Sequence, residues 1–118
     1  MKWFEGIPDV YLHREPVDFR KSINGLAVIV EQDMALSPYQ ESVFVFCNKQ
    51  RDKLKILCWD QTGFVLWYKR LEKAKFKWPR KHKRDVIQLN AESLDWLLRG
   101  FDIQTLTPHD TLVFESAL

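Results

Sequence analysis

Hydrophobic and polar residues alternate along this chain with two different periods, which predict strands in some segments and helices in others. Alternation with period two runs through three consecutive segments, Val43–Cys47, Lys53–Trp59 and Phe64–Leu71. The connections between them are short, so we expect three antiparallel neighbours in a meander. In the second connection Asp60 stands first and Gly63 fourth, an arrangement that favours a type I turn.

A helical period appears before this meander. Val10–His13 is typical of a short strand that ends before Pro16. The apolar residues that follow form one stripe at helical spacing: Phe19, Ile23, Leu26, Ala27 and Val30. Asp18 is the expected N-cap of this helix, and Ser37-Pro38 closes the unit. Gly25 is expected to permit close packing against another element.

The rest of the chain combines strand and helix patterns again. Val86–Leu89 is expected to add a strand, and Asn90 is a suitable N-cap for a helix that Gly100 ends. Thr111–Phe114 is a further candidate strand. The predicted fold is therefore α+β, with a single domain over residues 1–118 that packs two helices on an antiparallel β-meander of about four to six strands.

Length and composition agree with one domain. A chain of 118 residues with 46% hydrophobic residues can bury a core without metal or disulfides. Cys47 and Cys58 lie in strand-like runs and lack metal-ligand spacing, so we expect two buried, reduced thiols. The chain has no apolar run near the roughly 20 residues of a membrane span and no apolar block in its first six residues. We therefore expect a cytoplasmic protein without membrane contact.

Charge is distributed unevenly. The segment from Lys49 to Arg84 contains thirteen basic residues and three carboxylates, so its formal charge is +10. The rest of the chain has a formal charge of −8, and the two add up to the net charge of +2. The thirteen are Lys49, Arg51, Lys53, Lys55, Lys69, Arg70, Lys73, Lys75, Lys77, Arg80, Lys81, Lys83 and Arg84. Lys53 and Lys55 share a strand face, and the other basic groups can collect beside them if the register allows it.

Aromatic residues are interleaved with these charges, and the candidates for stacking or partner contact are Trp59, Trp67 and Trp78. This composition is typical of a surface that neutralises phosphates, but also of a solvated strand face above an aromatic core. The consecutive residues Arg80–Arg84 cannot bury themselves, so they either grip a polyanion or solubilise a loop. Arg20 and Lys21 either extend the patch or remain solvated on their helix.

Residues suited to catalysis are sparse. Two-metal nuclease chemistry needs several converging carboxylates, and Asp60 and Glu72 are too few to provide them. His13, His82 and His109 are far from one another and from the cysteines in sequence, so no zinc site is expected. Motifs for nucleotide phosphates or a serine nucleophile are missing from the sequence. The sequence therefore favours a non-catalytic protein without cofactor or metal.

Five motifs resemble those of a known family, the TnpB accessory protein of the insertion-sequence sixty-six family of bacterial transposable elements. They are Val17–Leu26, Phe46–Asp60, Gly63–Phe64, Trp67–Glu72 and Phe76–Pro79. This family is unrelated to the longer RNA-guided nuclease of the same name. The resemblance implies a role in transposition beside a separate transposase and a further small accessory protein, and it carries over no catalytic residue.

Two functions are compatible with these features. In the first, the thirteen basic residues, with Arg20 and Lys21, bind element DNA through its phosphates. In the second, the same face docks an acidic region of the transposase without touching DNA, and Trp67 and Trp78 act as anchors. The acidic remainder also permits self-association with the basic segment.

Overall fold

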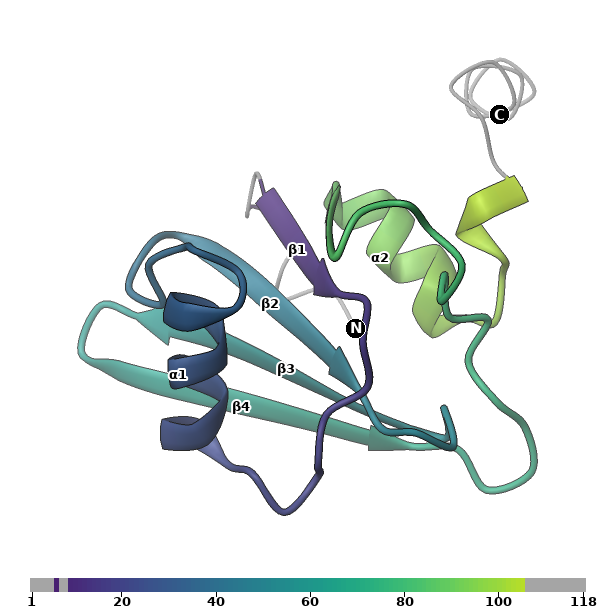
Figure 1. Ribbon diagram of the computed structural model, residues 1–118, viewed down its shortest axis with the longest axis horizontal. Helices are drawn as coiled ribbons and strands as arrows, with labels where there is room; N and C mark the ends of the chain where they lie inside the picture. Colours follow the sequence, from purple (N-terminus) through teal and green to yellow (C-terminus); the bar gives the residue numbers. More distant parts are fainter. Residues whose placement is uncertain (1–5, 7–8, 106–118) are drawn as a thin grey trace.

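Five strands form one mixed sheet in the computed structural model of this protein, which describes residue 6 and residues 9–105 (Figure 1). The strands are β1 (Asp9–His13), β2 (Ser42–Cys47), β3 (Lys53–Asp60), β4 (Gly63–Arg70) and β5 (Val86–Leu89), in the spatial order β4-β3-β2-β1-β5. The helices are α1 (Ile23–Gln32), α2 (Ala91–Leu98) and the short 3-10 helix η1 (Ile103–Thr105). The α+β prediction and the β2-β3-β4 meander are confirmed.

One strand pairing departs from the antiparallel pattern. β1 and β2 are parallel, because the chain between them crosses over through α1. β5 then pairs antiparallel with the other edge of β1. The candidate strand Thr111–Phe114 and His109 lie outside the described residues.

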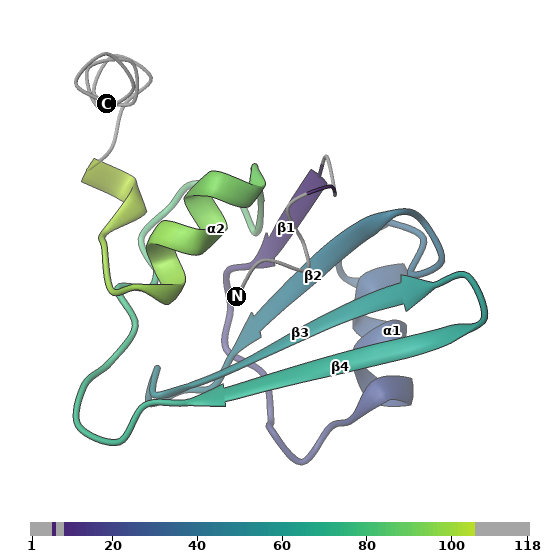
Figure 2. The same cartoon turned by 180° about the vertical axis from the view of Figure 1, so that it is seen from behind.

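The two faces of the sheet bury two separate apolar cores, and the helices lie on opposite faces (Figures 1 and 2). On the α1 face, buried residues of the helix meet alternate residues of β2 and β3: Leu26, Ile29, Val30, Phe44, Phe46 and Leu57. On the α2 face, the remaining strand residues meet the helix and two aromatic residues of a long loop: Val43, Val45, Leu54, Ile56, Leu94, Leu97, Phe76 and Trp78. The sheet is thus the middle layer of three.

The central strand β2 is apolar on both faces because both faces are covered. All six of its residues are buried. As predicted, Phe44 and Phe46 lie on one face and Val43 and Val45 on the other. A strand with one solvated face would carry polar residues at every second position instead.

Both cysteines are buried and reduced, as expected. Cys47 pairs in register with Leu54 and Cys58 with Val43, so the two thiols are not opposite each other. Burial raises the pKa of Cys47 to about 12 and also raises the pKa of Cys58. Both residues therefore contribute to the α2-face core as small apolar groups.

The first helix begins later than the apolar stripe predicted. Its N-cap is Ser22, whose side chain makes no capping hydrogen bond, so the prediction that Asp18 caps the helix is wrong. Asp18 instead binds Arg20, and the carbonyl of Asp18 accepts a hydrogen bond from Lys21 in a turn before the helix. Phe19 lies in this turn and still packs against the α1-face core, which explains why its spacing matched the stripe.

Two local predictions are corrected by the backbone. A Cβ on Gly25 would lie 3.1 Å from the Cβ of Lys21 in the preceding turn, so this glycine relieves crowding with Lys21 rather than with another element. In the turn between β3 and β4, Gln61 has φ of 49°, whereas a type I turn has negative φ at both central positions. Asp60 and Gly63 pair directly across this turn, which leaves two residues between the strands.

The turn between β2 and β3 is held by one buried amide, Asn48. Its Oδ1 accepts hydrogen bonds from the backbone of Asp52 (3.1 Å) and Lys53 (3.0 Å), and its Nδ2 donates to the Asp52 carboxylate (2.6 Å). The bond from Asn48 is the main reason that the pKa of Asp52 is lowered. This network allows Arg51 to keep a positive φ of 62°.

We predict that Asn48→Ala destabilises the protein by about 1–3 kcal/mol, because two partly buried backbone donors lose their acceptor. The measurement is urea unfolding followed by circular dichroism. Asn24→Ala is the matched control, since Asn24 is exposed on α1 and its replacement should change the free energy of unfolding by less than about 0.5 kcal/mol. Equal effects of the two substitutions would contradict the role of Asn48.

Candidate nucleic-acid interface

The most basic part of the chain is the segment 71–85, here called the basic loop, which leaves the end of β4 and runs toward α2 (Figure 2). Within it, Phe76 and Trp78 are buried in the α2-face core, while Lys75 and Lys77 are exposed. The alternation of aromatic and lysine residues therefore attaches the loop through its rings and directs its charges outward.

Backbone hydrogen bonds fix the beginning of the basic loop on the β2–β3 turn. The amide of Leu71 donates to the carbonyl of Asp52 (2.7 Å), and the amide of Phe76 donates to the carbonyl of Arg51 (2.8 Å). Farther on, the indole Nε1 of Trp78 donates to the carbonyl of Arg14 at 2.8 Å. The loop is therefore joined to two separate segments of the fold.

Arg14 organises the end of the basic loop, a role that no sequence pattern indicated. Its guanidinium donates to the carbonyls of Arg80 and Arg84, both at 3.1 Å, and to the Asp85 carboxylate at 2.6 Å. The bond to Asp85 is the main reason that the pKa of Arg14 is raised. The segment Arg80–Arg84, with its four lysine and arginine residues, thus lies on a backbone that Arg14 holds at both ends.

A cleft of about 530 Å³ lies between the basic loop, the β2–β3 turn and the segment after α2. Five cationic residues line this basic cleft: Arg51, Lys75, Lys77, Arg80 and Lys81. Asp102 is the acidic residue among its lining, beside Gly100 and Gln104. The tertiary structure thus gathers cations from two separate segments around one concave surface.

Other predicted basic residues are divided between the faces of the sheet. The register places Lys53 opposite Arg70 and Lys55 opposite Tyr68 on the α1 face, but Lys69 opposite Leu54 on the α2 face. These strand cations therefore do not collect on one side. The predicted basic residues that are exposed without lining the cleft are Arg20, Lys21, Lys49, Arg70, Lys73, Lys83 and Arg84.

Lys55 is a structural residue in this fold. Only 8% of it is exposed, and its Nζ donates to the carbonyls of Phe19 and Lys21, both at 2.8 Å. The same ammonium lies 4.9 Å from the centroid of the Phe19 ring. Burial lowers the pKa of Lys55. Its hydrogen bonds hold the segment before α1 against the sheet, so the Lys55 ammonium is not available to a phosphate.

We predict that Lys55→Met destabilises the protein by about 1.5–3 kcal/mol, because two carbonyl groups lose a charged donor. Lys53→Met is the matched control on the same strand and face, since Lys53 is partly exposed and no such bonds tie it to the segment before α1. Urea unfolding of both variants checks this, and a smaller loss for Lys55→Met than for Lys53→Met would contradict it.

Arg20 is exposed but is paired with a carboxylate. Its guanidinium binds Asp18 through both Nε (3.0 Å) and Nη2 (2.6 Å). The hydrogen bond from this side chain is the main cause that lowers the pKa of Asp18 from 3.8 to about 2. Arg70 forms a similar ion pair with Glu72 at 2.9 Å. Both arginines would have to leave these carboxylates before they could bind phosphate.

We predict that the Asp18 carboxylate titrates with a midpoint near pH 2 and that Arg20→Gln moves the midpoint part of the way back to 3.8. Since the folded pKa is lowered, any stability from this pair is present above pH 3.8 and is lost as the pH falls toward 2. Carboxyl-carbon NMR measures the midpoint. Lys21→Gln should move it less, and a larger shift than that of Arg20→Gln would contradict the pairing.

The three candidate tryptophans lie in different environments. Trp78 is buried, so its ring cannot stack on a base while the basic loop is in place. Trp67 is partly buried against the α2-face core. Trp59 is also partly buried and meets Phe64 at 5.0 Å and the exposed Tyr39 at 5.1 Å between ring centroids. This aromatic cluster lies at the opposite end of β3 from Arg51, so it is separate from the basic cleft.

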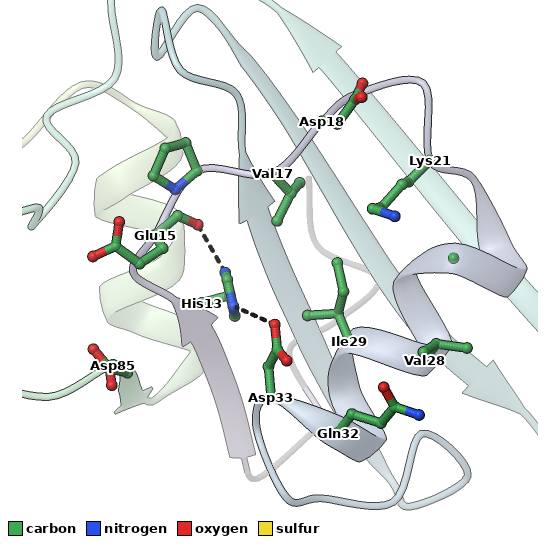
Figure 3. Close-up of a pocket in the computed structure, with 12 residues that line it drawn as sticks. His13, Glu15, Val17, Asp18, Lys21, Val28, Ile29, Gln32, Asp33 and Asp85 are labelled. Carbon is green, nitrogen blue, oxygen red and sulfur yellow. Dashed lines mark hydrogen bonds and ion pairs between the residues drawn. The ribbon is translucent and has the colours of Figure 1, made fainter.

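A second pocket, of about 830 Å³, lies between α1 and the segment that follows β1 (Figure 3). Its buried His13 contacts the carbonyl of Glu15 through Nδ1 at 2.7 Å and faces Asp33 through Nε2 at 3.7 Å. Asp18 and Asp85 also line this pocket, but they are paired with Arg20 and Arg14. The pocket is therefore mixed in charge, and its histidine and its carboxylates already have partners.

Residues 6 and 9–105 contain no cluster of three or more histidine, cysteine or carboxylate side chains that could hold a metal ion. None of the described helices is long and apolar enough to cross a membrane.

Known proteins similar to this chain were found by sequence. A family model described as IS66 Orf2 like protein matches residues 8–108. Two uncharacterized proteins of Sinorhizobium fredii are also similar to this chain. The protein y4jC is 36% identical over 75% of this chain and 74% of its own length. The protein y4hO is 30% identical over 79% of this chain and 80% of its own length. No solved structure gave a significant match. The family match covers α1, α2 and all five strands.

Proposed function

This chain belongs to the IS66 Orf2-like family of transposition-associated accessory proteins, and we propose that it binds DNA during transposition through the basic cleft. The sequence interpretation as an IS66 accessory protein is confirmed by the family match. The DNA is that of its own element, in the cytoplasm, and the protein acts beside the element's transposase and its other small accessory protein. Its contribution is binding rather than catalysis.

The observation that carries this proposal is the gathering of five cations around one concave surface. Arg51 comes from the β2–β3 turn, whereas Lys75, Lys77, Arg80 and Lys81 come from the basic loop. Holding like charges together is unfavourable in the free protein, and bound phosphates relieve this repulsion and release their counterions. A purely solubilising function would not require the charges to converge.

The anchoring of the loop suits it for binding. Phe76, Trp78 and Arg14 already fix the backbone that carries the lysines, so little conformational entropy is lost when DNA binds. The buried rings are not available for base stacking. Contacts with phosphates position a protein without reading sequence, so the proposed binding depends weakly on base sequence.

We predict a salt dependence that reports five phosphate contacts. The logarithm of the affinity should fall with the logarithm of salt concentration with a slope of about −4.5, a loss of about 500-fold between about 50 and 200 mM salt. Gel-shift titration with DNA from the element's ends and with scrambled DNA measures this, and similar affinities are expected for both. Failure to bind even at low salt would overturn the proposal.

Two variants of equal charge locate the contacts. The triple variant Lys75→Gln, Lys77→Gln, Lys81→Gln removes three cations of the cleft and should reduce the slope to about −2. The control Lys21→Gln, Lys49→Gln, Lys83→Gln removes three exposed lysines outside the cleft and should leave the slope near −4.5. Equal losses would assign binding to overall charge rather than to the cleft.

A binding experiment with the transposase distinguishes DNA binding from the adaptor function. If the protein has no affinity for DNA but is retained by the purified transposase after nuclease treatment, the basic face docks protein instead. A separate contact with the transposase, at the other end of the sheet from the basic cleft, is favoured by the exposed Tyr39 and its neighbours Trp59 and Phe64, because aromatic residues are enriched at protein interfaces. Loss of transposase binding in Tyr39→Ala, with DNA affinity unchanged, would assign this contact to the cluster.

A further inference from the structure

One edge of the sheet is unpaired in the structure. β4 is the outermost strand and pairs only with β3; both ribbon views show no strand along its outer side, whereas the segment before α1 and the first turn of α1 extend past that side (Figures 1 and 2). Among the described residues, the backbone hydrogen bonds outside regular elements do not involve Gly63–Arg70. Its outward N–H and C=O groups therefore form a template to which another strand can add.

β4 has few of the features that usually protect a sheet edge, because its charged residues, Lys69 and Arg70, stand only at its end. It has eight residues, contains no proline, and pairs with β3 in continuous register without a bulge. Its residues from Gly63 to Tyr68 carry no charge, and Val65 and Tyr68 are 42% and 48% exposed. The other edge strand, β5, has only four residues, and its exposed Gln88 is bonded to Asp9. The apolar, accessible edge is thus confined to β4.

We propose that β4 pairs with β4 of a second copy of this chain, antiparallel and about a two-fold axis at Leu66. This register places Phe64 opposite Tyr68 on the α1 face and Val65 opposite Trp67 on the α2 face, because opposed residues of antiparallel strands share a face. Leu66 meets its own equivalent at the axis. Every central position thus opposes an apolar or aromatic side chain, and such cross-strand pairs stabilise sheets.

The charges of β4 are compatible with a second copy as the occupant. In this register Lys69 lies opposite Gly63, and the lysines of the two copies are six residues apart along the strand direction, about 20 Å. This distance exceeds the screening length of about 8 Å at physiological salt, so the two cationic ends do not repel each other strongly. The strand is therefore complementary to itself in its apolar pattern, and its charges do not oppose the pairing.

The arrangement closes on itself and leaves the basic cleft accessible. A two-fold axis perpendicular to the sheet keeps the α2 faces of both copies on the same side, so the two basic clefts share one side of the assembly. Residue 71, where each basic loop begins, is ten residues along the strand from its equivalent, about 33 Å. The pairing does not depend on DNA binding and can be tested without it.

Sedimentation equilibrium or light scattering over a range of concentrations tests the pairing. Wild-type protein should reach about twice the 14.1 kDa of one chain. Val65→Lys should raise the dissociation constant of the dimer at least about tenfold, because it places like charges close together. In the proposed register each new lysine is a diagonal neighbour of the new lysine and of Lys69 in the other copy, and these charges repel one another. The matched control is Val28→Lys on α1, where valine is 49% exposed, and it should leave the dimer unchanged.

A cysteine at the axis tests the register. Leu66→Cys should form a disulfide-linked dimer on mild oxidation, whereas the native Cys47 and Cys58 are buried and should not. Circular dichroism of each variant establishes that it is folded. The proposal is overturned if the wild type stays monomeric, or if Val65→Lys dimerises like the wild type. The proposal is also overturned if the wild type is a monomer that binds the transposase through this edge. In that case Val65→Lys would lose the complex with the transposase.

Discussion

The insertion of Phe76 and Trp78 into the α2-face core is the interaction on which the arrangement of the basic loop depends. A segment with many like charges gains little by folding alone, because its repulsion and its conformational entropy both oppose order. Burial of two large aromatic side chains supplies an apolar driving force of about 1.5–3 kcal/mol each. The loop is therefore ordered by its uncharged residues, and its lysines are displayed as a consequence.

Polar anchors then determine where the ordered loop lies. Arg14 binds carbonyls of the loop's later part, and the β2–β3 turn binds its beginning through Arg51 and Asp52. Hydrogen bonds to the side chain of Asn48 stabilise the β2–β3 turn itself. These contacts join residues that are far apart in sequence, so a single change in the turn or in Arg14 affects the geometry of the basic cleft without touching a cleft lysine.

The two proposed functions, binding of DNA and pairing with a second copy, lie on different parts of the sheet. Its α2 face supports the basic loop, and its β4 edge offers a backbone template for a second copy. Lys55 shows how the same residue type serves differently on the α1 face, where it bonds two carbonyls and is withdrawn from the surface. A positive segment in the sequence therefore contains both structural and accessible cations, and burial distinguishes them.

The sequence by itself determined the strands of the meander, the strand Val86–Leu89, the helix after Asn90 and the buried thiols, because local periodicity and capping carry that information. The helical spacing placed the start of α1 too early. Phe19 fits that spacing, although it lies in the turn before the helix and packs against the α1-face core from there. Only the tertiary structure decided the parallel β1–β2 pair, the division of Lys55 and Lys69 between faces, and the convergence of Arg51 with Arg80. These features depend on register and on contacts between distant segments, which no local pattern encodes.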